Sequence, residues 1–189
     1  MHTSKISQMR GIEFEQGLLD MIEYINRRSP TKNMRLLEIG AYTGESTAIF
    51  CQHFKHVTTI DPYKDSYDPR DYVCHFSPMS KVYAAFRTRM SKYNNYKLIK
   101  KTSDEAIKEI ADQPVVHCFD VVYIDGMHQY AQVKRDILNY RAVVNRGGFV
   151  TGHDYSVTWA GNVDKAVNEI YGKPDVVFND TSWLVRKVT

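Results

Sequence analysis

The chain has 189 residues, of which 43% are hydrophobic and 25% are charged, and its formal net charge at pH 7 is +3. This length suits one domain with a single core, here residues 1–189, and the composition excludes a disordered chain. Lysine and arginine are spread along the sequence rather than clustered, so a nucleic-acid-binding surface is not indicated.

The cysteines and the N-terminal residues give indications of the cellular compartment. Cys51, Cys74 and Cys118 are odd in number and widely spaced, which favours reduced thiols over a disulfide framework or a zinc site. The N-terminal stretch lacks the apolar segment of a signal peptide, and no run approaches the length of a membrane span. We therefore expect a cytoplasmic protein.

The first predicted element is an amphipathic helix over Gly11 to Arg28, which ends at Ser29-Pro30. The next stretch, Met34 to Thr47, reads MRLLEIGAYTGEST and predicts a strand, a tight turn and a helix start. Gly40 lets the backbone turn and leaves room for a ligand, at which the next helix points its free N–H groups. Dinucleotide binders need a second glycine where this chain has Tyr42, so a pyrophosphate fits badly. Glu38 instead suits a cationic, phosphate-free ligand, because its carboxylate accepts hydrogen bonds from an ammonium group.

The string LLEIGAYTGES resembles the first motif of class I S-adenosylmethionine-dependent methyltransferases, most closely that of the catechol O-methyltransferase type. The resemblance implies an α/β, Rossmann-like fold: a seven-stranded mixed sheet with an antiparallel C-terminal hairpin and helices on both faces. It also implies that the helix before the first strand covers one side of the cofactor cleft, although that helix's pattern fits simple packing on the sheet equally well. The implied cofactor contacts in this motif are Glu38, Gly40, Ala41, Tyr42, Gly44 and Ser46.

A second predicted strand, His56 to Ile60, closes with Asp61, about twenty residues beyond the glycine turn. α/β nucleotide binders place a ribose-binding carboxylate there, so Asp61 is the predicted ribose ligand. A long loop follows and reaches residue 77, where Ser77-Pro78 opens a helix; the loop is predicted to fold over the site as a lid. Tyr63, Tyr67 and Tyr72 are candidate substrate contacts in it, or simply surface aromatics.

A third strand is predicted over Tyr96 to Lys100, and Thr102 to Glu105 opens a helix that runs to Ala111. Ser103 suits the N-cap of that helix. The family resemblance adds that the matching serine meets the adenine edge, which is compatible with capping.

Phe119 to Asp125 is an apolar run that predicts a central strand buried on both faces, followed by a helix up to Tyr140. Asp125 ends this strand, where open α/β sheets bind ligands. In the resembled enzymes the matching aspartate holds a divalent metal or lies close to the methyl donor, and the residue three further on, a lysine, acts as base. His128 stands there in this chain and could accept a hydroxyl proton, or it could be an ordinary surface residue.

Gly147 to Tyr155 predicts a glycine turn and a short strand that ends at His153 and Asp154. With Asp125 they offer one nitrogen and two carboxylates, a set that could bind Mg²⁺ or another divalent cation. The catechol-type enzymes have Asp-Asn here, and the GHDY string also resembles methyltransferases that act on sugars and other natural-product hydroxyls. The metal-free alternative has His153 orienting the substrate and Asp154 capping the turn.

The last part alternates a helix over Asn162 to Tyr171 with strands over Asp175 to Phe178 and Trp183 to Val188. An antiparallel hairpin after βα units is the pattern of the class I methyltransferase sheet. The predicted function is O-methylation of a small-molecule hydroxyl, with S-adenosylmethionine as cofactor. The alternatives are a non-methylating S-adenosylmethionine-binding protein and a nucleic-acid methyltransferase, although IDGM takes the place of the Asn/Asp-Pro-Pro-Tyr type of motif. Neither nucleic acid nor membrane is expected as a partner, and a homodimer is left open.

Overall fold

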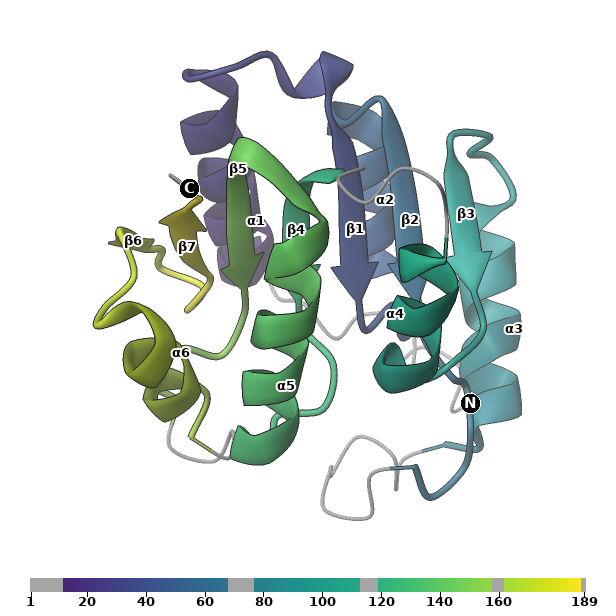
Figure 1. The fold of residues 1–189 in the computed structure, drawn as a ribbon. Helices are drawn as coiled ribbons and strands as arrows, with labels where there is room; N and C mark the ends of the chain where they lie inside the picture. Colours follow the sequence, from purple (N-terminus) through teal and green to yellow (C-terminus); the bar gives the residue numbers. More distant parts are fainter. Residues whose placement is uncertain (1–11, 68–76, 113–118, 158–161, 188–189) are drawn as a thin grey trace.

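A computed structural model describes residues 12–67, 77–112, 119–157 and 162–187. Figure 1 shows three layers, in which α1, α2 and α3 lie on one face of a central sheet and α4, α5 and α6 on the other. The helices are α1 (Ile12–Asn26), α2 (Glu45–His53), α3 (Met79–Met90), α4 (Ser103–Ala111), α5 (Tyr130–Tyr140) and α6 (Val163–Tyr171), with short 3₁₀ turns at Thr31–Asn33 and Arg141–Val143. This is the layered α/β arrangement that the resemblance implied.

The sheet has seven strands in the order β3-β2-β1-β4-β5-β7-β6. These are β1 (Arg35–Ile39), β2 (His56–Ile60), β3 (Tyr96–Ile99), β4 (Phe119–Ile124), β5 (Val144–Gly152), β6 (Val176–Val177) and β7 (Trp183–Arg186). The pairs from β3 to β5 are parallel, whereas β7 pairs antiparallel with both β5 and β6. The predicted mixed sheet with its antiparallel C-terminal hairpin is therefore confirmed.

Side-chain alternation along the strands builds one core on each face of the sheet. Leu36 packs in the core beneath α1, α2 and α3, and its neighbour Leu37 packs in the core beneath α4, α5 and α6. Val121 and Val122 divide in the same way on β4. Because β1 and β4 are covered on both faces, they read in the sequence as the near-continuous apolar runs that predicted central strands.

The sequence predicted a glycine turn before the fifth strand, and the structure corrects this. Gly147 and Gly148 lie inside β5, and the register with β4 shifts between Phe119 and Val121. Gly147 has φ +80°, and a Cβ on Gly148 would lie 2.5 Å from the Asp120 carbonyl oxygen. The glycines therefore form an irregularity within a longer strand.

Two further features concern segment length. The predicted strand over Asp175 to Phe178 is reduced to Val176–Val177, at the edge of the sheet. Among the helices of the described residues, none is both long enough and apolar enough to cross a membrane.

Candidate functional site

The candidate site lies along the carboxyl ends of the parallel strands. Ile39 pairs with Ile60 and with Ile124, and Ile124 pairs with Gly152. The residues that follow these four, Gly40, Asp61, Asp125 and His153, therefore stand in one row at the same edge of the sheet. Backbone hydrogen bonds continue the strand pairing into this row. The N–H of Gly40 donates to the carbonyl of Ile60 at 2.8 Å, that of Asp125 to Ile39 at 2.8 Å, and that of His153 to Ile124 at 3.0 Å.

The turn after β1 uses conformations that favour glycine. Gly40 has φ +94° and Gly44 has φ +81°. A Cβ on Gly40 would lie 2.0 Å from the carbonyl oxygen of Asp125, so the two strand ends approach too closely for any side chain. Tyr42 also has a positive φ of 44°. Gly44 is the N-cap of α2, and no side chain makes a cap hydrogen bond at this helix end, which directly follows the turn.

Glu38 lies behind the turn rather than in the cleft. Its side chain is fully buried, and its carboxylate accepts hydrogen bonds from the hydroxyls of Ser46, Thr47 at 2.5 Å and Thr59 at 2.8 Å. Burial raises the pKa of Glu38 to about 7, although the three hydroxyl donors act in the opposite direction. The position predicted for an ammonium ligand is therefore filled by protein hydroxyls, and Ser46 faces Glu38 as one of them.

Asp61 lies beside the turn, as its spacing predicted. Its two carboxylate oxygens accept hydrogen bonds from the backbone N–H groups of Tyr42 at 2.9 Å and Tyr63 at 2.8 Å. Burial raises the pKa of Asp61 to about 6, against the lowering effect of these backbone donors. The backbone N–H of Ala41 is a third donor to this carboxylate, which leaves one of its four lone pairs for a hydroxyl group of a ligand.

Ser103 is placed differently from the prediction. The N-cap of α4 is Thr102, whose side chain forms a capping box with Glu105. Ser103 is the next residue and is buried; its hydroxyl lies 3.1 Å from Gln132 Nε2 and hydrogen-bonds to Asp136. The Ser103 hydroxyl thus both accepts and donates a hydrogen bond within the protein. An adenine contact through its side chain would have to displace one of these bonds.

A cluster of acidic and imidazole side chains forms the other half of the edge. His128 Nε2 lies 2.8 Å from Asp154 Oδ2 and 3.8 Å from Asp125 Oδ1. His153 Nδ1 lies 3.1 Å from Asp154 Oδ1 and 3.7 Å from Asp125 Oδ1. All four side chains are at most 23% exposed. The strand ends thus bring together every residue predicted for catalysis or metal binding.

The pKa values in this cluster are set by the close contact of its carboxyl groups with its imidazoles. Burial alone would lower the pKa of His128, but Asp125 and Asp154 outweigh it and raise the value to about 10. Burial likewise opposes ionisation of Asp154, yet the two imidazoles hold the pKa of this carboxyl below its ordinary value. The two carboxylates therefore attract a positive charge between them.

The donor set suits a divalent cation. Asp125, His128 and Asp154 each offer one ligand atom, and these atoms lie within 4.8 Å of one another. The sequence had paired His153, not His128, with the two aspartates. His153 lies beside Asp154, and its Nε2 faces the buried Asp180 Oδ2 at 4.0 Å, a residue that no pattern in the sequence pointed to. Two carboxylate oxygens and one imidazole nitrogen fit a borderline ion such as Mn²⁺ at least as well as Mg²⁺.

The tyrosines of the loop after β2 have separate places. Tyr63 is buried, Tyr67 is partly buried near Asp136 and Asp104, and Tyr72 lies outside the described residues. Most of the predicted lid is also outside them. The structure therefore describes the start of this loop, which leaves the edge at Asp61.

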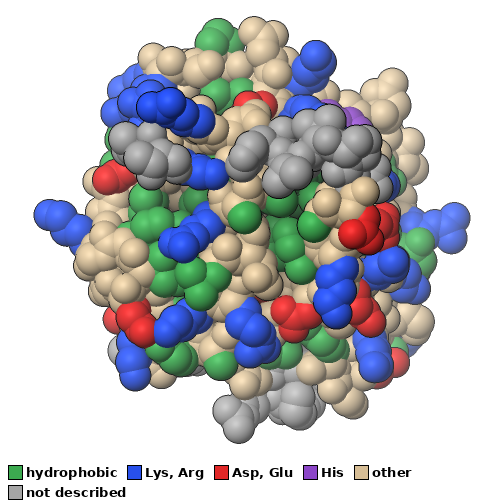
Figure 2. Space-filling model, in the orientation of Figure 1, with side chains coloured by type: hydrophobic (Ala, Val, Ile, Leu, Met, Phe, Trp, Pro, Cys, Tyr) green, Lys and Arg blue, Asp and Glu red, His purple; other side chains and the backbone are tan. Residues whose placement is uncertain are grey.

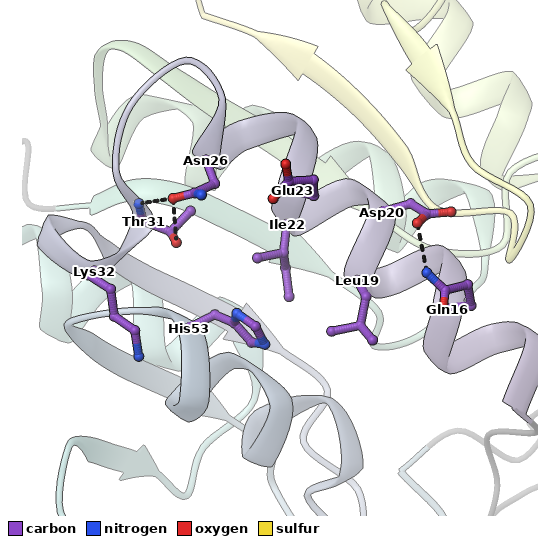
Figure 3. A pocket seen from close by; sticks show the side chains of 9 residues that line it. All are labelled: Gln16, Leu19, Asp20, Ile22, Glu23, Asn26, Thr31, Lys32 and His53. Atoms are coloured by element: carbon purple, nitrogen blue, oxygen red, sulfur yellow. Dashed lines mark hydrogen bonds between the residues drawn. The ribbon is translucent and has the colours of Figure 1, made fainter.

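A pocket of about 370 Å³ lies elsewhere, between α1, the 3₁₀ turn before β1 and the end of α2 (Figure 3). Its lining residues are Gln16, Leu19, Asp20, Ile22, Glu23, Asn26, Thr31, Lys32 and His53. Thr31 and Lys32 precede β1 and His53 ends α2, so the pocket opens at the amino end of β1. None of the predicted site residues lines it.

The fold and the edge site define a Rossmann-like protein of the class I S-adenosylmethionine-dependent methyltransferases. The model of a family described as "Methyltransferase domain" matches residues 37–155, and the chain belongs to this family. The matched segment begins in β1 and ends just after Asp154, so it contains the glycine turn, Asp61, Asp125 and His128.

The chain is also similar to individual proteins and solved structures. "Uncharacterized protein R132" of Acanthamoeba polyphaga mimivirus is 32% identical over 142 residues, which is 73% of this chain and 59% of that protein. The O-methyltransferase NovP has a TM-score of 0.67 at 16% identity, over 97% of this chain and 83% of its own. The N-methyltransferase NodS from Bradyrhizobium japonicum WM9 has a TM-score of 0.60 at 14% identity, over 94% and 98%. The chain thus spans about three fifths of the viral relative, and the similar structures differ in the atom they methylate.

Proposed function

We propose that the protein transfers a methyl group from S-adenosylmethionine to a hydroxyl group of a small molecule. The observation that carries this proposal is the cluster of Asp125, His128 and Asp154 one strand away from the glycine turn. A hydroxyl acceptor needs its proton removed, and this cluster supplies carboxylates and an imidazole for that task. An amine acceptor that is already neutral needs no such group.

The proposed cofactor position follows the edge of the sheet. The methionine part is proposed to lie beside the turn that follows Gly40, and Asp61 offers its remaining lone pair to a ribose hydroxyl. We place the adenine near the start of α4, where the backbone of Ser103 is a better candidate than its engaged hydroxyl. When bound, S-adenosylmethionine supplies an electrophilic methyl group on a sulfonium.

The chain's own residues would then align and deprotonate the acceptor. The acceptor oxygen is proposed to lie beside Asp125, opposite the methyl group, because direct displacement needs oxygen, carbon and sulfur in line. In the metal-free version His128 takes the proton of the acceptor hydroxyl, with Asp154 stabilising the imidazolium at 2.8 Å. Because the pKa of His128 is raised to about 10, the imidazole must first release its own proton, so this version requires methyl transfer to speed up as the pH rises toward 10. A divalent cation held by Asp125, Asp154 and His128 would supply positive charge that favours the deprotonated acceptor.

The nucleic-acid alternative has little support on the face of the molecule that Figure 2 shows. Over the face formed by α4, α5 and α6, Figure 2 shows Lys and Arg side chains interspersed with acidic and apolar ones rather than in a continuous stripe. Phosphate backbones are bound by clustered positive charge, which this face does not offer.

Calorimetry with S-adenosylhomocysteine tests the cofactor, with and without Mg²⁺ or Mn²⁺. We expect micromolar binding that Asp61→Ala abolishes and that Asp112→Ala, an exposed carboxylate at the end of α4, leaves unchanged. No binding by the folded wild-type protein would refute the proposal.

A transfer assay tests the acceptor. Phenol, catechol and sugar hydroxyls are offered beside primary amines, and labelled methyl transfer is followed. Transfer to amines alone would refute O-methylation while leaving the methyltransferase class intact. Cofactor binding without transfer to any acceptor would favour the non-methylating alternative.

A further inference from the structure

A closed set of hydrogen bonds joins the turn after β1 to the segment after β2. Asp61 Oδ2 accepts from the backbone N–H of Tyr42 at 2.9 Å, and Asp61 Oδ1 accepts from the backbone N–H of Tyr63 at 2.8 Å. The hydroxyl of Tyr63 then donates to the carbonyl oxygen of Tyr42 at 2.8 Å. This closed set of hydrogen bonds involves protein atoms only, so the turn and the carboxylate proposed to bind the ribose are fixed to each other without a ligand.

The two tyrosines joined by these hydrogen bonds adopt left-handed backbone conformations. Tyr42 has φ +44° and Tyr63 has φ +45°. Bulky residues rarely adopt such conformations, which persist only where the surrounding contacts hold them and which cluster at functional sites. Two of them joined through one carboxylate indicate that the shape of this corner serves ligand binding.

The Tyr63 side chain is itself held in one position. Its ring is 7% exposed and packs against Tyr83, with centroids 4.9 Å apart, and against Phe86 at 5.7 Å. Phe86 also lies against the turn, because a Cβ on Gly44 would be 2.9 Å from its ring. Burial raises the pKa of the Tyr63 hydroxyl far above its ordinary value, so the hydroxyl remains a hydrogen-bond donor. Packing against α3 therefore holds the Tyr63 hydroxyl in place as a hydrogen-bond donor to the carbonyl oxygen of Tyr42.

We propose that Tyr63 is a positioning residue for the cofactor: its hydroxyl holds the Tyr42 carbonyl and so keeps the Gly40–Gly44 turn in place against Asp61. Asp61 then has two tasks, since it shapes the turn through its backbone donors and binds the ribose through its remaining lone pair. The inference rests on the proposed function, because it takes this turn and Asp61 as the S-adenosyl site. It adds a residue whose side chain touches the turn.

The test compares Tyr63→Phe with Tyr93→Phe, and each variant loses one hydroxyl. Tyr93 follows α3 at the opposite edge of the sheet, where its hydroxyl accepts from Gln52 at 3.1 Å. We expect the affinity for S-adenosylhomocysteine, measured by calorimetry, to fall about tenfold in Tyr63→Phe, the size of one lost hydrogen bond with an acceptor left behind. Tyr93→Phe should bind within twofold of the wild type. A loss of stability alone leaves the dissociation constant of the folded protein unchanged, so the readout reports positioning.

Hydrogen exchange gives a second readout on the same two variants without ligand. Peptides that cover residues 40–47 should exchange faster in Tyr63→Phe than in Tyr93→Phe, because the turn loses the hydrogen bond to the Tyr42 carbonyl. If the wild type binds S-adenosylhomocysteine and Tyr63→Phe binds it with the same affinity, the inference is overturned. Equal exchange rates of residues 40–47 in the two variants would overturn it as well. Failure of the wild type itself to bind would refute the proposed function instead, so the two failures can be told apart.

Discussion

Replacing Glu38 by glutamine tests whether this carboxyl is as buried as the structure shows. Its pKa rises from an ordinary 4.5 to about 7, so the folded protein binds the proton more tightly than the unfolded chain does. The stability that comes from this proton is complete below pH 4.5 and is lost as the pH rises to about 7. Because one pKa unit is worth about 1.4 kcal/mol, ionisation of Glu38 costs the fold about 3 kcal/mol at pH 8.

Glutamine cannot ionise, and the three hydroxyls around it can rotate to accept as well as donate. Urea unfolding of both proteins at pH 5 and pH 8 isolates the effect. Between these values the wild type should lose about 2–3 kcal/mol of unfolding free energy relative to Glu38→Gln. Glu23→Gln, at an exposed carboxylate of α1, is the matched control and should run parallel to the wild type. Parallel curves for Glu38→Gln would refute the burial argument.

The remaining predictions concern the strand edge. Asp154→Asn should lower Mn²⁺ affinity at least about tenfold in calorimetry while S-adenosylhomocysteine affinity stays within twofold; unchanged Mn²⁺ binding would remove Asp154 from the metal site. His128→Gln should lower kcat by about 10²–10⁴ with cofactor affinity retained, and a kcat within threefold of the wild type would exclude His128 as base. Gly40→Ala should cost at least about 3 kcal/mol of unfolding free energy, because its Cβ would meet the Asp125 carbonyl; a loss below 1 kcal/mol would contradict that contact.

The sequence could predict which residues reach the edge of the sheet. β1 and β4 are mostly apolar runs and β2 is a β-branched run, each is followed by a glycine or an aspartate, and parallel strands bring such ends into one row whatever the loops do. Asp61 and Asp125 were predictable for this reason. The short turn-rich link from Asn179 to Ser182 indicated a hairpin between the last two strands, and the family resemblance added that the sheet ends in this way.

The direction and partners of individual side chains could not be predicted in this way. Glu38 is part of β1, and only the tertiary structure reveals that Ser46, Thr47 and Thr59 fill the space around it. Thr102 and Ser103 are both good caps, and their difference depends on Gln132, which lies 29 residues beyond Ser103. Long-range packing of this kind leaves no local pattern.

The place of β7 has a consequence for how the protein folds. The glycine turn and Asp61 follow strands that pair without any help from residues beyond 124, whereas β5, which precedes Asp154, completes its outer hydrogen bonds with residues 183–187. The β1–β4 pair, however, joins Leu36 to Val121, a much longer separation than that of Phe149 and Arg186 in the β5–β7 pair, and pairing over long separations forms slowly. We expect the strand pair of the acceptor half to form before the pair that joins the two halves, so pulsed hydrogen exchange during refolding should protect β5 and β7 before β1 and β4. Simultaneous protection would show that the two halves fold as one unit.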